Sequence, residues 1–435
     1  MTKKRVLFLP IEIAGYAGRL QSTLSGFGWE ADVLDLSGDP LGYGAVPPQF
    51  PLISRMRRLA AWSARSPWRQ LVGTALSLPW RIWITLFYLP RYDALVYLFG
   101  TTLLGGGDLR YARRRGVRIV AVFLGSDSRP PYMSGRYADA QSWRQWQQVR
   151  FVTARTSRRI RRFEHFADEI VCSPTSAQFL TRPFVNWFAV GMPSPVAEPA
   201  GSPTLPPPPS NGRVRVAHAP TRPAQKGTEA ITRALATCAA GVELETVSGV
   251  SNSEVARLLR RSDFVVDELY SDTPIGGLGV ESAQLGRAAF TFGYAADFLG
   301  PSLARFGVPT RSYAHPSELD RVLRQAVQDP AWRAEVAAEN RRFVTEHWSA
   351  AGVAGRLAHV LNGSTPRSWL SDPAVLDYCL GWGMSAATAG AFWREYLRRF
   401  GPAGLQLPAD SPVASAIQEA SVNADSLPQG LRSAE

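Results

Sequence analysis

The sequence predicts an α/β protein of two doubly wound domains, each built on a parallel sheet. Two series of short apolar runs alternate with helix-like segments, the first over residues 5–172 and the second over residues 213–291. This alternation is typical of parallel strands joined by crossover helices. A proline-rich stretch, residues 193–212, separates the two series and indicates a stiff linker. We therefore expect a ligand cleft between the carboxyl ends of the two sheets.

The first domain is predicted over residues 1–192. Its run 94–99 is apolar throughout, as expected for a strand that is buried on both faces of a sheet. Helices are expected at 19–27, at 108–115 and in the basic stretch between 139 and 164. The expected strands are residues 5–10, 31–36, 94–99, 117–123 and 169–172.

The second domain is predicted over residues 213–362, followed by a helical extension at 363–405 and a polar tail at 406–435. The extension is rich in aromatic residues and has a helical pattern over 369–400. The tail is rich in Ser, Ala, Pro and Gln and has no apolar period, so we expect it to be disordered. Strands are expected at 213–218, 242–246, 264–267 and 288–291, and helices at 228–238, 253–261, 279–285, 317–327 and 330–362.

Positive charge is concentrated in the first half of the chain. The net charge is +12, and residues 1–192 hold 26 Lys and Arg against 12 Asp and Glu, a net of +14. Two stretches, 40–92 and 140–163, contain no acidic residue. Such a face attracts anionic lipid, nucleic acid or acidic substrates. Nucleic acid is not expected as a partner, because the sequence contains no recognisable reader motif.

The apolar stretch 75–89 is not expected to span a membrane. It contains Pro79 and Arg81 and is shorter than the roughly 20 residues that a spanning helix needs. Two interpretations stay open: a helix that lies on a membrane surface, or a buried helix whose arginines reach solvent. The three cysteines are widely spaced and show no disulfide or zinc pattern, which favours a reducing cytoplasm. The expected location is cytoplasmic, with peripheral attachment at the inner membrane face as an option.

Two loops of the second domain carry residues suited to a diphosphate. Arg222 and Lys226 lie between the first strand of this domain and its first helix, where a helix start adds N–H donors for an anion. Gly276, Gly277 and Gly279 lie between a later strand and a helix that carries Glu281 near its start. Glycines allow a close backbone approach to phosphate, and a carboxylate accepts the paired hydroxyls of a ribose. Each loop alone also fits a plain solvated turn with a capped helix.

Together the two loops resemble the donor domain of GT-B glycosyltransferases of the retaining, glycogen-synthase-like superfamily (families 4 and 1). The segment HAPTRPAQKGTEAI, 218–231, resembles that family's phosphate loop, and IGGLGVESAQLGRAAF, 275–290, resembles its glycine loop and ribose-binding helix. The segments YDALVYLFGTTLL, 92–104, and FADEIVCSPTSAQFL, 166–180, are similar to parts of its acceptor domain. The resemblance covers residues 3–362 and implies a nucleoside diphosphate sugar as donor, with no other cofactor.

The resemblance also implies roles for individual residues. Electrostatic stabilisation of the departing diphosphate would fall to Arg222 and Lys226, with Asp127 as a third candidate at the catalytic centre. The sequence contains no Asp-x-Asp motif in a suitable loop and no histidine cluster, so no metal is expected. The residues that would bind the donor are Gly15, Gly18, His218, Thr273, Gly276, Gly277, Leu278, Gly279 and Glu281. For His218, which ends a strand, a structural role is the alternative.

The sequence departs from the family's pattern at two positions. Thr273 stands where many members have a first Glu, with Asp272 beside it, and Leu124 stands where many have His. We expect a metal-independent hexosyltransferase that acts on an acceptor hydroxyl, with a glycan or a lipid-linked acceptor at a membrane as the candidates. The alternatives are a catalytically degenerate GT-B protein that binds a nucleotide or glycan as a partner in glycan biosynthesis, and a sugar-nucleotide epimerase on the same fold.

Overall fold

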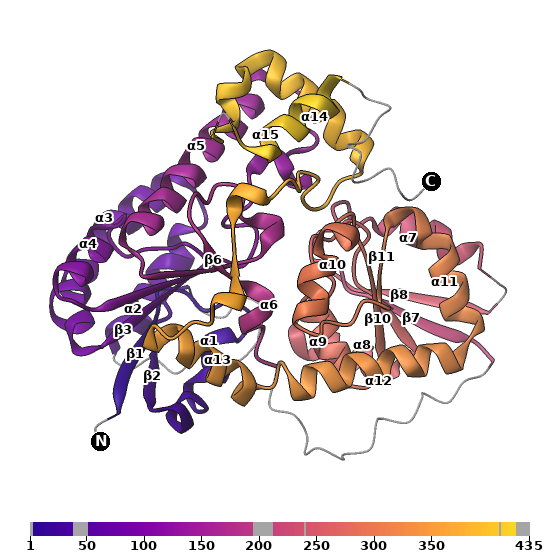
Figure 1. The fold of residues 1–435 in the computed structure, drawn as a ribbon, viewed down its shortest axis with the longest axis horizontal. Coiled ribbons are helices and arrows are strands. Elements are labelled where there is room, and N and C mark those ends of the chain that lie inside the picture. The colour runs from indigo at the N-terminus through magenta and orange to yellow at the C-terminus, as the bar shows by residue number, and fades with distance from the viewer. Residues whose placement is uncertain (1–2, 38–50, 195–211, 239–240, 409, 423–435) are drawn as a thin grey trace.

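The computed structural model describes residues 3–37, 51–194, 212–238, 241–408 and 410–422 (Figure 1). It contains two α/β units side by side, the first indigo to magenta and the second pink to orange. Most of the predicted linker, residues 195–211, lies outside the described residues.

The first unit is built on a seven-stranded sheet in the order β12-β6-β5-β4-β3-β1-β2. Neighbouring strands are parallel, except that β12 is antiparallel to β6. All five residues of β3 are buried, as the unbroken apolar run predicts. Its strands are β1 Lys4–Leu9, β2 Trp29–Val33, β3 Ala94–Leu98, β4 Arg118–Val122, β5 Glu169–Cys172, β6 Phe184–Asn186 and β12 Leu370–Ser371. Its helices are α1 Tyr16–Gln21, α2 Pro51–Ser63, α3 Pro67–Trp83, α4 Gly107–Arg114, α5 Trp143–Phe166 and α6 Trp187–Val190.

The second unit is built on a five-stranded parallel sheet in the order β11-β10-β9-β7-β8. Its strands are β7 Val214–His218, β8 Val242–Thr246, β9 Phe264–Val266, β10 Ala288–Phe292 and β11 Tyr313–Ala314. The helices that follow them are α7 Thr228–Ala236, α8 Asn252–Arg261, α9 Gly277–Gln284, α10 Ala296–Arg305, α11 Leu319–Gln328 and α12 Pro330–Glu346. The predicted fold class, two doubly wound domains, is confirmed.

The chain returns to the first unit after α12, which corrects the predicted end of the second domain. Helix α13, Ala350–Asn362, buries Val353 and Leu357 in the same apolar core as the first sheet. Arg118, at the start of β4, donates a hydrogen bond from Nε to the carbonyl oxygen of Val360 at 3.1 Å. The amphipathic pattern of α13 predicts the helix itself, but not which of the two sheets it covers.

The C-terminal segment differs from the prediction in two ways. Instead of a helix over 369–400, only α14, Ala386–Phe400, is an α-helix, because Pro373, Gly381 and Gly383 interrupt the preceding part. The predicted disordered tail contains helix α15, Pro412–Val422, which packs against α14 and buries Val413 and Ile417. Hydrophobic burial against α14 therefore orders this part of the tail, and residues 423–435 lie outside the described residues.

The α14–α15 pair packs on the first unit. The rings of Trp146 in α5 and Phe392 in α14 lie 4.7 Å apart. Trp393 donates from Nε1 to the carbonyl oxygen of Tyr132 at 2.8 Å. Among the described residues, no helix is both long and apolar enough to cross a membrane.

Candidate functional site

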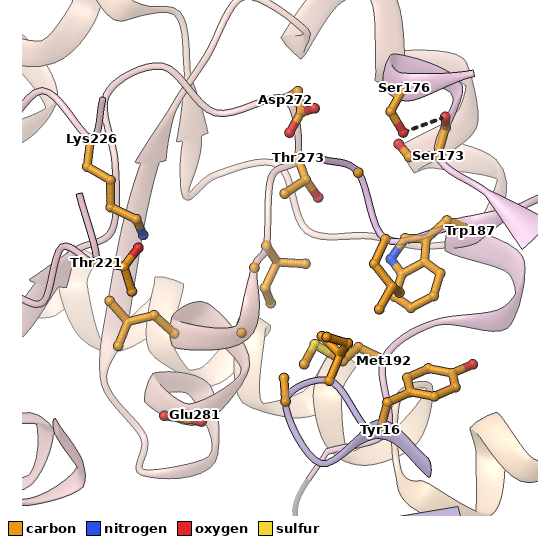
Figure 2. Close-up of a pocket in the computed structure, with 18 of the residues that line it drawn as sticks. Tyr16, Ser173, Ser176, Trp187, Met192, Thr221, Lys226, Asp272, Thr273 and Glu281 are labelled. Atoms are coloured by element: carbon orange, nitrogen blue, oxygen red, sulfur yellow. Dashed lines mark hydrogen bonds between the residues drawn. The ribbon is translucent and has the colours of Figure 1, made fainter. Parts of the chain in front are cut away.

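A cavity of about 390 Å³ lies between the two units (Figure 2). Loops that follow β1, β4 and β5 line it from the first unit, and loops that follow β7 and β9 line it from the second, together with helix α9. In open parallel sheets, ligands bind outside the carboxyl ends of the strands. The cavity therefore occupies the position where the fold predicts a ligand.

Helix α9 begins in the wall of this cavity. Gly276 is the N-cap residue in an extended conformation, and Gly277, Leu278 and Gly279 form the first turn. The first turn contains no acidic residue, and Val280 is the first residue whose N–H bonds back to Gly276. The start of an α-helix presents N–H groups without intrahelical partners and the positive end of the helix dipole. Gly276, Gly277 and Leu278, which were predicted to bind the donor, line the cavity.

Lys226 lines the cavity, but two carboxylates already hold it. Its ammonium lies 2.6 Å from Asp267 Oδ1 and 3.5 Å from Glu268 Oε2. Burial alone would lower the pKa of the ammonium, but Asp267 and Glu268 together raise it, so Lys226 is charged. The Lys226 ammonium is thus in contact with two carboxylate side chains. A diphosphate that binds here must compete with these carboxylates for the ammonium.

Arg222 and His218 do not line the cavity, in contrast to their predicted roles. Arg222 is exposed on the same loop as Lys226. His218 is fully buried, and its ring nitrogens lie 2.8 Å from the carbonyl oxygen of Val266 and 2.8 Å from Thr228 Oγ1. The structure therefore corrects both expectations: His218 ties β7 to β9 and to the start of α7, and Arg222 faces solvent.

Glu281 lines the cavity together with a residue that the sequence did not single out. Asn252, the first residue of α8, donates from Nδ2 to both carboxylate oxygens of Glu281 at 3.0 and 3.1 Å. Burial raises the pKa of Glu281, and the Asn252 bonds partly oppose this rise. Asn252 begins the helix that follows the carboxyl end of β8. This position in the chain is the signal from which its place at the cavity could be predicted.

Thr273 and Asp272 line the cavity side by side (Figure 2). Asp272 also forms an ion pair with a residue of the first unit. The guanidinium of Arg129, in the loop after β4, donates from both Nε and Nη2 to Asp272 Oδ2, the Nε bond measuring 2.9 Å. Both side chains are nearly buried. This ion pair therefore links the two units, and the Asp272 carboxylate is bonded to Arg129.

In the first unit, a carboxylate already occupies the start of α1. Glu12 accepts the N–H groups of Ile13, Ala17 and Gly18, the last at 2.9 Å. Gly15 is the N-cap residue of α1, and neither Gly15 nor Gly18 lines the cavity. The structure therefore does not bring these two glycines to the cavity wall, and Glu12 accepts the N–H groups of this turn. The residues of this turn that do line the cavity are Ile13, Ala14 and Tyr16.

Asp127 supports the cavity wall and does not line it. The side chain is 1% exposed, and its Oδ1 accepts the N–H of Leu124 at 2.9 Å. Its backbone oxygen accepts a hydrogen bond from Arg159 Nη2. Burial raises the pKa of Asp127 to about 6, against the opposing charges of Arg159 and Arg129. The structure corrects the expected catalytic contact: Asp127 shapes the loop in which Leu124 and Gly125 line the cavity.

A strap formed by residues 376–385 joins the two units beside the site, and sequence reasoning missed it. Trp382 donates from Nε1 to Glu268 Oε2 at 3.0 Å, and its carbonyl oxygen accepts the N–H of Gly135 at 2.7 Å. The N–H of Gly383 bonds to the carbonyl oxygen of Tyr270 at 2.8 Å. A Cβ at Gly135 would lie 1.8 Å from the Gly383 oxygen, so this close approach requires glycine. Glu268 thus bonds both to Lys226 and to the strap.

Within the described part of the chain, no group of three or more His, Cys, Asp or Glu side chains is placed to hold a metal ion. The ligand groups that the second unit offers to the cavity include the α9 amides, the Lys226 ammonium, the Glu281 carboxylate and the Thr273 hydroxyl. The structure therefore brings together most of the predicted donor-site residues of the second unit. Of those predicted in the first unit, it brings none to the cavity wall.

Two Rossmann-like domains that face each other across a cleft form the GT-B architecture. The chain is similar to the solved glycosyltransferase SnogD from Streptomyces nogalater, with 16% identity, 82% of this chain and 99% of that chain covered, and a TM-score of 0.37. It is also similar to HepE from Anabaena in complex with UDP-glucose, with 11% identity, 83% and 100% coverage and a TM-score of 0.44. A third similar structure is WaaG, a glycosyltransferase involved in lipopolysaccharide biosynthesis, with 12% identity, 82% and 100% coverage and a TM-score of 0.42.

No protein-family model and no curated protein sequence matches the chain. Likenesses of the size found among solved structures leave the donor and the acceptor of this protein open.

Proposed function

We propose that the protein is a glycosyltransferase that moves a hexose from a nucleoside diphosphate sugar to an acceptor hydroxyl. The observation that carries this proposal is the interdomain cavity, in which the start of α9 and the Glu281 carboxylate lie in one wall. An anion-binding helix start beside a buried carboxylate suits a diphosphate joined to a ribose.

Each lining group of the second unit has a proposed role. The amides of Gly277 and Leu278 bind the diphosphate, and Lys226 adds a positive charge to it. Glu281, oriented by Asn252, accepts the ribose hydroxyls. Thr273 lies where the transferred sugar would contact the second unit. These groups stabilise the departing diphosphate without a protein nucleophile or a divalent metal.

The acceptor belongs on the basic first unit. We propose a glycan or a lipid-linked acceptor, bound by a cytoplasmic protein that attaches peripherally to the inner membrane face. The net charge of +14 over residues 1–192 supports an anionic partner on this side of the cleft.

A second candidate function is nucleotide or glycan binding without catalysis. The state of Lys226 favours it, because Asp267 and Glu268 already neutralise the ammonium. The Arg129–Asp272 ion pair favours it as well, since the carboxylate next to Thr273 lines the cavity but is already bonded to Arg129.

Turnover separates the two candidates. The wild-type protein is titrated with UDP-, GDP- and ADP-hexoses by calorimetry, and release of nucleoside diphosphate is followed in the same panel. Binding of one donor with measurable release supports the transferase. Binding without release, with and without added glycan or lipid acceptors, supports the binding protein. A folded protein that binds no member of the panel contradicts both candidates.

A further inference from the structure

A second cavity, of about 940 Å³, lies in the first unit and is lined by guanidinium groups. Its walls are α3, the loop after β3 and α5. The arginines that line this cavity, hereafter the arginine cavity, are Arg81, Arg155, Arg158, Arg159 and Arg162. Most of them come from the acid-free stretch of α5.

In the described part of the chain, none of these five guanidiniums has a carboxylate within 4 Å. Arg81 and Arg159 each donate to a single backbone oxygen, of Leu103 and Asp127 respectively. The Nε atoms of both side chains are buried, and the described structure gives them no hydrogen-bond partner. The two acidic residues whose charges act on these arginines are hydrogen-bonded to backbone N–H groups. Asp108 accepts the N–H groups of Leu103 and Leu104, and Asp127 accepts that of Leu124.

This arrangement is electrostatically costly without an anion. Burial lowers the pKa of Arg81 and of Arg159, and the charges of Asp108 and Asp127 respectively oppose this only in part. Buried charges in proteins are normally paired. A phosphate would provide the missing acceptors, and several arginines can bind it with forked hydrogen bonds.

An exposed apolar ridge borders the arginine cavity. Trp68 is 58% exposed and Leu71 is 75% exposed, although both belong to the long helix α3. Leu78 and Ile82 lie both on this ridge and in the wall of the cavity. The exposed apolar side chains of the ridge are Trp68, Leu71, Val72, Leu76, Leu78, Trp80, Ile82, Trp83, Leu86 and Phe87. Single exposed apolar residues are ordinary, but a continuous series of this length indicates an interaction surface.

We propose that the arginine cavity and the ridge form one docking site for an anionic lipid surface. The cavity binds the phosphate of a headgroup, and the ridge lies among the acyl chains. A soluble anion would account for the arginines but not for the ridge. A helix with apolar residues on one side and arginines beside them is typical of segments that lie in a membrane interface.

The site lies next to the interdomain cleft. Phe123 lines the cleft, Phe163 lines the arginine cavity, and their rings lie 5.6 Å apart in an edge-to-face contact. A lipid phosphate in the arginine cavity would be held behind this wall, so that a sugar attached to the lipid could extend toward the cleft. That the lipid is the acceptor rests on the proposed function, whereas lipid binding does not.

Vesicle co-sedimentation of the full-length protein, without donor, tests the inference. Vesicles of phosphatidylcholine are compared with vesicles of phosphatidylcholine and phosphatidylglycerol. The wild-type protein should bind the anionic vesicles, and less so as salt rises. The double variant Arg155→Gln/Arg162→Gln should bind about tenfold less. Leu71→Ser/Leu76→Ser, which leaves every arginine in place, should also bind about tenfold less.

The control is Arg110→Gln/Arg114→Gln on α4, an exposed pair in the same unit whose substitution changes the net charge equally. It should keep most of the binding. If this control lost as much vesicle binding as Arg155→Gln/Arg162→Gln, net charge alone would explain the loss and the proposed site would be wrong. Inorganic phosphate is the second probe: if it binds the wild type and the ridge variant equally but binds Arg155→Gln/Arg162→Gln more weakly, while no vesicle binds, the site takes a soluble anion and the lipid inference is wrong.

Failure of this inference is distinguishable from failure of the proposed function. Donor calorimetry contains no lipid, and vesicle binding contains no donor, so either result can be negative while the other is positive. Thermal unfolding of each variant checks that the fold is retained. The substituted leucines are exposed, and no loss of core packing is expected from them.

Discussion

The interdomain cavity and the arginine cavity differ in whether their positively charged side chains are paired with carboxylates. In the interdomain cavity, Lys226 is matched by Asp267 and Glu268, and the nearby Arg129 is matched by Asp272. In the arginine cavity, five guanidiniums line one space without a carboxylate in contact, as far as the described residues extend. A cation that is paired with a carboxylate stabilises the fold, and a ligand can bind it only by displacing that carboxylate. A cation without such a partner can bind an anion directly.

Because of this difference, we expect the two units to bind different ligands. The second unit binds the proposed diphosphate mainly with backbone amides at α9, where a helix start attracts an anion without a buried unpaired charge. The first unit uses side-chain charge for the proposed lipid surface. Substitutions at the paired residues of the cleft test this difference.

The largest effect is expected from breaking the Arg129–Asp272 ion pair. Asp272→Asn leaves a buried guanidinium without its counter-ion and should lower the free energy of unfolding by about 3–5 kcal/mol. Thermal and urea unfolding, followed by tryptophan fluorescence, measure the loss. Glu335→Gln is the control, because its pair with Arg311 is more than half exposed and should contribute less than about 1 kcal/mol. Equal, small losses in both variants would contradict the role of this ion pair as a fastening between the units.

A pH effect is expected from Asp127. Its folded-state pKa is raised to about 6 from an ordinary 3.8, so the folded protein holds a proton that the unfolded chain has lost between these values. Stability should therefore fall as pH rises from about 4 to about 6, by up to about 3 kcal/mol for a shift of about two units. Asp127→Asn should flatten this part of the curve. Urea unfolding at a series of pH values measures it, and an unchanged slope in the variant would refute the assignment to Asp127.

Donor affinity should depend on Glu281. Glu281→Gln keeps the size of the side chain but weakens its acceptance of the ribose hydroxyls, and should reduce donor affinity about tenfold, or ~1–2 kcal/mol. Calorimetric titration with the donor found in the panel provides the measurement. Glu254→Gln, on the exposed face of α8, should bind like the wild type. Equal affinities for all three proteins would place the ribose elsewhere.

The smallest effect is expected from Trp382 in the strap. Trp382→Phe keeps an aromatic ring but removes the Nε1 hydrogen bond to Glu268, and should lower the free energy of unfolding by about 1 kcal/mol. Trp143→Phe is the control because its ring is largely exposed. A strap that contributes nothing would give the two variants the same unfolding midpoint.

The local patterns of the sequence predicted most of the described strands and the position of the cleft, because both depend on short-range periodicity and on where parallel strands end. They missed the short strands β6, β11 and β12, which have two or three residues each. The same reasoning pointed to Lys226, Thr273 and Glu281, which lie in one cavity in the structure, although their roles stay predictions. It missed Glu12, because a single carboxylate that accepts the N–H groups of the following turn has no sequence motif to mark it.

Contacts between distant segments were outside the reach of such patterns. Arg129 and Asp272 are 143 positions apart, and Trp382 and Glu268 are 114 apart. A composition-based prediction of disorder also failed for α15, since its weakly apolar face becomes ordered only against α14. For the same reason, the sequence could not show that Arg222, in the same loop as Lys226, faces solvent.

The central claim, a nucleoside diphosphate site inside the cleft, is tested most directly by a matched pair of variants. Lys226 lines the cavity and Arg222 does not, although both belong to the same loop and carry the same charge. In calorimetric titrations with the preferred nucleoside diphosphate, Lys226→Gln should lose about tenfold in affinity or more, and Arg222→Gln should bind like the wild type. A loss in Arg222→Gln with none in Lys226→Gln would place the diphosphate on the outer loop and contradict the claim.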